Sequence, residues 1–236
     1  MVNNKIYILS TRPVGETARA KALEHDIVLE EKSFIETKET IGASKAKKIK
    51  ELLAQNLSVV FTSMNAVEAV GKMVSERNTW KIFCIGNTTR KLVKEIFGEK
   101  NIAGAADNAS ALADSIIKTP IKNIVFFSGD QRRDELPEKL RKNHIEVEEI
   151  VVYKTLETPE SLSKSYDAIL FFSPSAVRSF FSKNTVNDTT QLFAIGSTTA
   201  RAAERHASRP VIIARKPGKE NLVSLAIKHY SKSPIL

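Results

Sequence analysis

The sequence predicts an α/β protein made of two doubly wound lobes, each with a parallel sheet. Three observations support this fold class. Short apolar strands alternate with helices, each strand runs into a turn of Ser, Thr, Asn or Gly, and the whole pattern is written twice. Strands that alternate with helices favour a parallel sheet, because each crossover helix covers a face of that sheet. The chain has 236 residues, of which 42% are hydrophobic, and this is enough for two small cores.

Six short runs rich in Ile, Val and Phe are the expected strands, because buried parallel strands read as continuous apolar segments. They are residues 6–9, 59–61, 82–85, 124–127, 169–172 and 192–195. Each run is followed by a polar turn and then by apolar residues spaced three and four apart, which is typical of a helix with one buried face. The helices we cite as examples are 89–97, 133–142 and 199–206. We therefore expect flavodoxin-like architecture in each lobe.

Two phrases recur in a 110-residue register. VVFTSMNAVEAV (59–70) resembles ILFFSPSAVRSF (169–180), and IGNTTRKLV (85–93) resembles IGSTTARAA (195–203). We name these matching segments Y1 and Y2. The recurrence indicates an internal duplication.

A second pair of segments, X1 and X2, repeats at a slightly different offset. IYILSTRP (6–13) resembles IVFFSGDQ (124–131), and IVLEEKSFIET (27–37) resembles IEVEEIVVYKT (145–155). The order along the chain is X1-Y1-X2-Y2. Polar segments at 36–44 and 155–165 follow X1 and X2, so both are candidate crossings between lobes.

The paired crossings favour a discontinuous lobe. On this interpretation residues 1–34 plus 159–236 form one lobe, residues 40–153 form the other, and 35–39 and 154–158 are the two linkers. Two sequential lobes divided near residue 120 are the alternative, which periodicity alone does not exclude.

Composition narrows the class of partner. The net charge of +9 favours an anion: nucleic acid, acidic lipid or a small polyanionic metabolite. No stretch reads as a basic arm, an RNA-binding aromatic motif or a zinc finger, which disfavours nucleic acid. No apolar run approaches the roughly 18–20 residues that span a bilayer. The start has no signal-peptide pattern, and the single Cys84 fits a reducing compartment, so we expect a cytoplasmic protein.

The repeated IGNTT and IGSTT phrases lie where α/β sheets bind ligands, at the carboxyl ends of strands. Gly86 and Gly196 permit tight turns, and the hydroxyl residues after them offer side-chain caps and free backbone N–H groups. Capping alone is the plainer interpretation of any one such turn. Similar turns recur at 10–12, 62–65, 128–129 and 173–175. We expect two such edges to face each other across a cleft that suits a ligand with several carboxylates or phosphates.

Taken together, these motifs resemble the uroporphyrinogen-III synthase family over essentially the whole chain. The similarity is carried by TRP (11–13), FTSMNAV (61–67), IGNTT (85–89), GDQRR (129–133), VVYKT (151–155), FFSPSAV (171–177) and IGSTTARA (195–202). No single motif is decisive, but their order and spacing are specific. The X1-Y1-X2-Y2 plan is also similar to that family's two flavodoxin-like lobes joined by paired linkers.

The resemblance implies a reaction. Members of that family close hydroxymethylbilane, a linear tetrapyrrole with eight carboxylates, to uroporphyrinogen III with loss of water and inversion of ring D. It implies a cyclising lyase of haem biosynthesis that uses neither metal nor organic cofactor. The substrate would be handed over from hydroxymethylbilane synthase, with no nucleic acid or membrane involved. We expect a monomer, because no long apolar stripe demands a partner.

Tyr153 is the catalytic candidate. The repeat aligns it with Ile35, and a purely structural strand position could have stayed aliphatic in both copies. The resemblance implies that a tyrosine in the VYKT-like segment assists departure of the substrate hydroxyl, and a normal phenol is protonated at neutral pH. The alternative is a tyrosine that fills the junction between lobes with its hydroxyl in water.

The substrate-binding candidates are glycines and hydroxyl residues at strand ends, together with two arginines that could meet carboxylates in forked geometry. They are Arg12, Thr62, Ser63, Gly86, Thr88, Thr89, Arg133, Ser173, Ser175, Gly196, Thr198 and Thr199. Either arginine could instead be an ordinary surface charge. Two functions remain as alternatives to the lyase: a non-catalytic two-lobed receptor for a small polyanion, and a nucleic-acid-binding protein suggested only by the charge.

Overall fold

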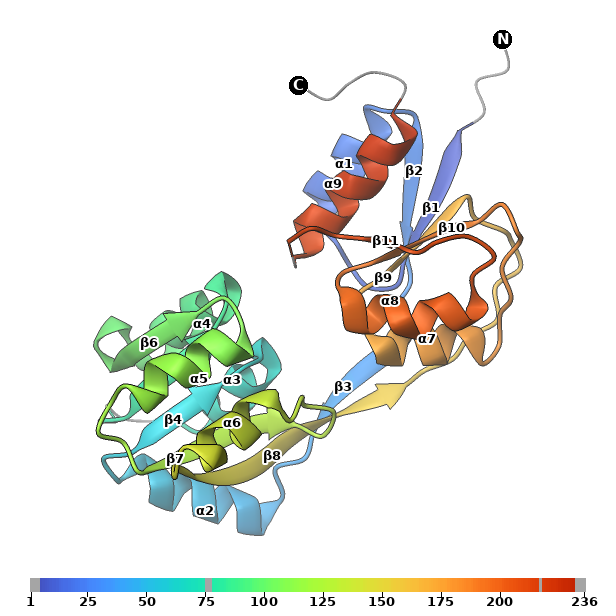
Figure 1. The fold of residues 1–236 in the computed structure, drawn as a ribbon. Coiled ribbons are helices and arrows are strands. Elements are labelled where there is room, and N and C mark those ends of the chain that lie inside the picture. The colour runs from blue at the N-terminus through green and yellow to red at the C-terminus, as the bar shows by residue number, and fades with distance from the viewer. Residues whose placement is uncertain (1–4, 75–77, 217, 232–236) are drawn as a thin grey trace. The chain divides into compact units, whose positions relative to one another are not determined.

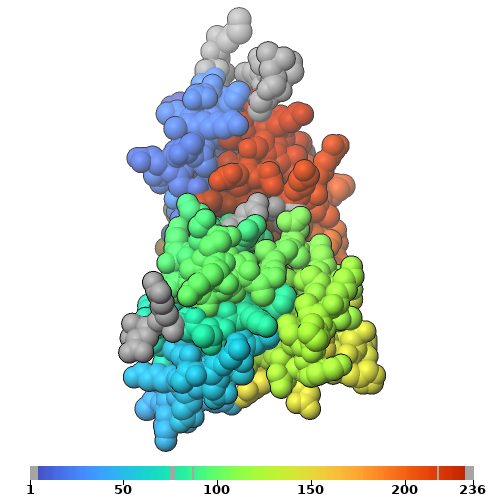
Figure 2. Space-filling model, turned by 90° about the vertical axis from the view of Figure 1, so that its left-hand side faces the viewer, coloured from blue at the N-terminus to red at the C-terminus, as the bar shows by residue number. Residues whose placement is uncertain are grey.

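The computed structural model describes residues 5–74, 78–216 and 218–231. The chain divides into two compact units. Unit 1 comprises Met1–Glu36 and Leu156–Leu236, and unit 2 comprises Thr37–Thr155. Figure 1 shows the first and last described elements, β1 (Ile6–Ser10) and α9 (Lys219–Tyr230), in one unit, and in the space-filling view of Figure 2 that unit is blue and red while the other runs from cyan to yellow.

Unit 1 contains a five-stranded sheet in the order β11-β10-β9-β1-β2, in which every neighbouring pair is parallel. Its strands are β1 (Ile6–Ser10), β2 (Ile27–Glu31), β9 (Ala168–Phe171), β10 (Gln191–Ala194) and β11 (Ile212–Ile213). Its helices are α1 (Glu16–Leu23), α7 (Pro174–Phe181), α8 (Ser197–Ala203) and α9 (Lys219–Tyr230), with a short 3-10 helix at Glu204–His206. Because successive side chains of a strand point to opposite faces, Ile8 packs with α1 and α9 while Leu9 packs with α7 and α8.

Unit 2 contains a six-stranded sheet in the order β3-β8-β7-β4-β5-β6. Its strands are β3 (Ile35–Glu39), β4 (Ser58–Phe61), β5 (Lys81–Ile85), β6 (Ile102–Ala106), β7 (Asn123–Gly129) and β8 (Glu146–Glu157). Its helices are α2 (Ala43–Leu53), α3 (Met64–Gly71), α4 (Asn87–Phe97), α5 (Ala109–Ile117) and α6 (Glu135–Lys142), with a 3-10 turn at Glu99–Asn101. From β8 to β6 the pairs are parallel. Phe61 and Phe127 face α3 and α4, whereas Phe126 faces α5 and α6.

The predicted α/β class with parallel sheets is confirmed. All six expected strands are present, and the three cited helices differ from expectation only at their ends: α4 begins at Asn87, α6 begins at Glu135, and α8 stops at Ala203 before the 3-10 turn. Within the described residues no helix is both long and apolar enough to cross a bilayer.

The duplication is visible in the backbone. Among the described residues, Asp26 (φ 60°) and His144 (φ 59°) are the non-glycine residues with positive φ, and they occupy equivalent places in X1 and X2. Each follows a helix, α1 or α6, and precedes the next strand, where a left-handed residue reverses the chain. The copies differ just beyond this point. X1 breaks into β2 and β3, whereas X2 continues as the single twelve-residue strand β8.

Candidate functional site

Strands β8, β7, β4 and β5 lie side by side in unit 2, so parallel pairing brings their carboxyl ends to one edge of the sheet. Ser63 follows β4, Gly86 follows β5 and Gly129 ends β7. Tyr153 of β8 lies beside Gly129, where the β7–β8 register shifts by one residue. We call this the unit 2 edge.

Ser63 and Tyr153 meet at the unit 2 edge. Ser63 starts helix α3 from extended backbone (φ −145°), and its Oγ accepts the N–H of Ala66 at 3.3 Å, the usual N-cap bond. The Tyr153 hydroxyl donates to the same oxygen at 3.0 Å. The half-buried Tyr153 ring packs against the core cluster that contains Phe61 and Phe127. The catalytic candidate thus lies in contact with one of the binding candidates.

The hydrogen-bond count at Ser63 fixes what this pair can offer. A serine hydroxyl has one hydrogen and two acceptor positions. Ser63 Oγ accepts from both Ala66 and Tyr153, so its own hydrogen is available to a third group. The pair can therefore donate one hydroxyl hydrogen to an oxygen of a bound molecule, which is the contact that a general acid needs.

The two repeated glycines differ in conformation. Gly86 has φ +75°, and its N–H donates to the carbonyl of Ala106 at 2.8 Å, whereas Gly196 is extended with φ −176°. Each glycine itself is the N-cap residue, and neither α4 nor α8 has a side-chain cap bond. The expectation of hydroxyl caps after IG is therefore wrong. Because glycine has no cap oxygen, the first-turn amides are not satisfied from that position.

The hydroxyl candidates fall into two groups by exposure. Thr89, Ser175 and Thr199 are 6%, 5% and 2% exposed, so they are buried. The others reach the surface at least in part: Thr62, Ser63, Ser173 and Thr198 are half-buried, and Thr88 is exposed. Only this second group can meet a ligand without a local rearrangement.

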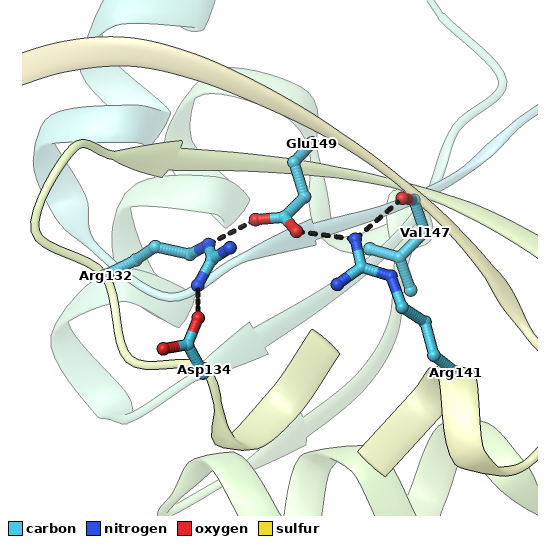
Figure 3. A network of polar contacts seen from close by, with 5 residues as sticks. All are labelled: Arg132, Asp134, Arg141, Val147 and Glu149. Atoms are coloured by element: carbon cyan, nitrogen blue, oxygen red, sulfur yellow. Dashed lines mark hydrogen bonds and ion pairs between the residues drawn. The ribbon is translucent and has the colours of Figure 1, made fainter. Parts of the chain in front are cut away.

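Arg133 and its neighbour Arg132 have different environments. Arg132 pairs with Glu149 and Asp134, and Glu149 also accepts from Arg141 at 2.6 Å (Figure 3). This network fastens the loop after β7 to strand β8. Arg133 is exposed, and no ion pair involves it within the described part of the chain. Arg133 is thus the arginine of this loop that a carboxylate can reach without breaking the network.

Unit 1 presents a corresponding edge after β1, β9 and β10. Thr11 is 1% exposed and its hydroxyl donates to the carbonyl of Leu170 at 2.7 Å, while Ser10 Oγ donates to the carbonyl of Arg12 at 2.6 Å. These bonds fix the turn that carries the exposed Arg12. The Arg12 guanidinium lies 5.7 Å from the centre of the Phe172 ring, a cation–π distance that leaves its N–H groups free to bind an anion. We call this the unit 1 edge.

Ser173 repeats the role of Ser63 as a helix cap at the unit 1 edge. Its Oγ accepts the N–H of Ala176 at 3.1 Å at the start of α7. Its second side-chain contact is the hydroxyl of Ser175, also at 3.1 Å. The serine cap is therefore common to both units, but the second contact differs.

Carboxylates also occur at both edges. Asp130 follows β7, and its Oδ1 accepts the N–H of Thr155 at 2.9 Å. Glu31 ends β2, and its Oε1 accepts the N–H groups of Val14 and Gly15, each at 3.0 Å. Backbone donors of the same unit thus neutralise part of this charge.

Within unit 2 the fold gathers most of its candidates at one edge, and the same is true of unit 1. The unit 2 edge holds Thr62, Ser63, Gly86, Thr88, Thr89 and Tyr153, with Arg133 in the adjoining loop, and the unit 1 edge holds Arg12, Ser173, Ser175, Gly196, Thr198 and Thr199. Sequence reasoning missed Gly129, which lies directly against the Tyr153 ring. A signal was present, since the repeat has Thr11 at the equivalent position.

Comparisons with known proteins agree with this architecture. The family model described as uroporphyrinogen-III synthase HemD matches residues 18–224. A protein of Saccharomyces cerevisiae named uroporphyrinogen-III synthase is 25% identical over 211 residues, which cover 74% of this chain and 76% of that protein. Among solved structures, uroporphyrinogen-III synthetase of Helicobacter pylori has a TM-score of 0.68 at 17% identity, covering 95% of this chain and 99% of its own. A mutant uroporphyrinogen III synthase of Thermus thermophilus has a TM-score of 0.61 at 15% identity, covering 95% and 98%.

Proposed function

The chain belongs to the uroporphyrinogen-III synthase family, and we propose that it closes linear hydroxymethylbilane to uroporphyrinogen III with loss of water and inversion of ring D. It is a cyclising lyase of haem biosynthesis. The reaction begins with ionisation at the ring A hydroxymethyl carbon. Ring D then attacks through its substituted carbon, and the resulting spiro intermediate fragments and recloses in the inverted sense.

The first step needs an acid, because hydroxide is a poor leaving group until it is protonated. We assign this role to Tyr153. The observation that carries the assignment is the hydrogen bond from its hydroxyl to Ser63 at 3.0 Å, at the edge where α/β sheets bind ligands. Because the pair has one hydroxyl hydrogen to donate outward, a substrate oxygen can receive it from Ser63 or, if Ser63 donates to the phenol oxygen, from Tyr153.

Binding of the carboxylates is shared among many donors. The accessible candidates at the two edges are Thr62, Ser63, Thr88, Ser173 and Thr198, with Arg12 and Arg133 as the charged donors. A hydrogen bond to a charged group contributes about 1.5–3 kcal/mol, so several such bonds hold a substrate with eight carboxylates without one dominant site. Thr89, Ser175 and Thr199 are buried in the first turns of α4, α7 and α8, which supports a role in holding these helix starts in place rather than in direct contact with substrate.

We further propose that the protein acts as a cytoplasmic monomer that takes its substrate from hydroxymethylbilane synthase. The free and buried Cys84 is consistent with a reducing compartment. Hand-over fits the chemistry, because free hydroxymethylbilane tends to close without inversion.

The test of the proposed function is the isomer made. Purified protein is supplied with freshly generated hydroxymethylbilane, the products are oxidised, and the type I and type III porphyrins are separated chromatographically. We expect type III to dominate with the protein and type I without it. Type I product alone, at the rate of the protein-free control, would refute the lyase.

A further inference from the structure

We propose that Gly129 is a positioning residue for the reaction: its lack of a side chain lets the Tyr153 ring lie across the end of β7 and reach Ser63. This inference rests on the catalytic role proposed for Tyr153. It assigns a function to a residue that lies within the GDQRR motif (129–133) but is not among the candidate site residues.

The order of strands creates the requirement. Tyr153 is on β8, Ser63 follows β4, and β7 lies between these two strands. Neighbouring strands are about 4.8 Å apart, so the strands that carry Tyr153 and Ser63 are about two strand spacings apart. The phenol ring must therefore pass over the backbone of the intervening strand. The residue of β7 beneath it is Gly129, which pairs with Tyr153.

The contact leaves no room for a side chain. A Cβ placed on Gly129 would lie 2.4 Å from Cζ, 2.6 Å from Cε2 and 2.7 Å from the hydroxyl oxygen of Tyr153. Real Cβ atoms essentially never approach other heavy atoms below 3.0 Å, so the ring would have to move. The atoms that clash are those that carry the hydroxyl, and so the displacement falls on the hydrogen bond to Ser63.

Backbone conformation does not explain this glycine. Positive φ occurs at Gly15, Gly86, Gly98 and Gly218 among the described glycines, and Gly129 is not one of them. An alanine at this position would therefore meet a steric problem from Tyr153 and no backbone penalty.

The repeat supplies an internal comparison. The position equivalent to Gly129 in X1 is Thr11, a buried residue whose hydroxyl donates to Leu170 across the neighbouring strand β9. The position equivalent to Tyr153 is Ile35, which has no hydroxyl to place. A side chain thus fits directly after β1 in the copy without the tyrosine, whereas the equivalent position at the end of β7, in the copy with the tyrosine, has none.

Hydrogen bonds also hold the backbone on either side of the contact between Gly129 and Tyr153. The N–H of Asp130 donates to the carbonyl of Tyr153 at 3.1 Å, and the Asp130 carboxylate accepts the N–H of Thr155. Because these bonds hold β8 against β7, an added methyl group cannot be relieved by moving the strand alone. The Tyr153 side chain has to rotate away instead.

The test is Gly129→Ala combined with Tyr153→Phe. We expect Gly129→Ala to lower kcat by about 100-fold, the scale of a 1 Å misplacement of a reacting group. In the Tyr153→Phe background the same substitution should change kcat by less than about twofold, because the hydroxyl to be placed is already gone. The matched control is Gly104→Ala, whose Cβ would lie 2.9 Å from the buried Phe83 ring at the far side of the sheet. It should destabilise unit 2 and leave kcat unchanged.

A second measurement, the free energy of unfolding, tests whether the Tyr153 ring is what excludes a side chain at residue 129. Gly129→Ala should lower the free energy of unfolding when residue 153 is Tyr or Phe, since either ring lies against residue 129. It should not lower this free energy when residue 153 is Ala. Loss of kcat in Tyr153→Phe without any loss in Gly129→Ala overturns the positioning role alone, as does an equal loss in both backgrounds. Wild-type kcat in Tyr153→Phe overturns the proposed role of Tyr153, and the positioning role with it.

Discussion

The unit 1 edge and the unit 2 edge are built from the same repeated sequence motifs but differ in the side-chain contacts of their capping serines. Ser63 and Ser173 both cap the helix that follows the strand, and the Oγ of each accepts the N–H of the alanine three residues on. At the unit 1 edge the second contact of the serine is a neighbouring hydroxyl, that of Ser175. At the unit 2 edge it is the phenol of Tyr153, from a strand two places away. The cap belongs to the fold, and the second contact distinguishes the site.

A carboxylate shows the same exchange of partners. Glu31 and Glu149 are equivalent in X1 and X2; Glu31 holds the segment after β1, and Glu149 holds the segment after β7. Glu31 does so through the backbone N–H of Val14, whereas Glu149 does so through the side chain of Arg132, the residue equivalent to Val14. The position of the contact is therefore the same in the two copies, whereas the group that donates to the carboxylate differs.

Removal of the phenol hydroxyl should have the largest effect. We expect Tyr153→Phe to lower kcat by about 10²-fold or more, the range typical of a general acid, because the phenol that we propose as proton donor to the leaving hydroxide is lost. The free energy of unfolding should change by less than about 1.5 kcal/mol, since one hydrogen bond is removed. Steady-state kinetics and urea unfolding measure the two quantities. Tyr7→Phe, at a 38% exposed tyrosine of β1, is the control and should retain wild-type kcat.

The repeated glycines should differ in their tolerance of alanine. Neither has an atom within 4 Å of a built Cβ, so sterics are equal and only the backbone distinguishes them. Gly86→Ala should cost about 1–3 kcal/mol of unfolding free energy because φ +75° with ψ 160° is a region that only glycine adopts readily. Gly196→Ala, in extended backbone, should cost less than about 0.5 kcal/mol. Equal losses in urea unfolding would contradict this comparison.

The two capping serines should separate stability from catalysis. Ser63→Ala and Ser173→Ala each remove an N-cap and should each cost about 1 kcal/mol of unfolding free energy. Ser63→Ala should also lower kcat about tenfold, the equivalent of one hydrogen bond in the transition state. Ser173→Ala should lower it less. A greater loss of kcat in Ser173→Ala would place the chemistry at the unit 1 edge instead.

Lowering the pH should reveal a small contribution of Glu30, in unit 1, to the free energy of unfolding. The hydrogen bond from Lys164 lowers the pKa of Glu30 below its usual 4.5; burial opposes this shift, and the hydrogen bond from Tyr166 adds to it. A lowered folded pKa means that the stabilisation is complete above the unfolded pKa and is lost as pH falls through the folded value. The Glu30 side chain is 38% exposed, so the contribution is a few tenths of a kcal/mol.

The check for this cluster is urea unfolding between neutral pH and about pH 3, across the titration range of carboxyl groups. Glu30→Gln should remove this part of the acid sensitivity. Adding Lys164→Met to Glu30→Gln should cause no further change, because the two groups act as a pair. Additive effects of the two substitutions would show that they act separately.

Much of the fold follows from local patterns. Continuous apolar runs such as 124–127 are strands because they are buried on both faces, and the polar turn after each run leads into a helix whose apolar spacing matches one buried face. The repeat likewise shows in the residues themselves. Among the six strands and three helices named from the sequence, the differences lie at the ends of the elements. The cap positions after IG were assigned to hydroxyls, although glycine occupies them, because sequence does not reveal which residue of a turn makes the last non-helical step.

The candidate site divides differently between sequence and structure. The sequence by itself determined that donors cluster at strand ends and that Tyr153 departs from its repeat partner Ile35. Only the tertiary structure decided that Tyr153 meets Ser63 across β7 and that Gly129 makes room for it. The physical reason is sheet order. Residues 63, 129 and 153 are far apart in the chain, and they become neighbours only when β8, β7 and β4 pair in that order with a one-residue shift between Ser128 and Gly129.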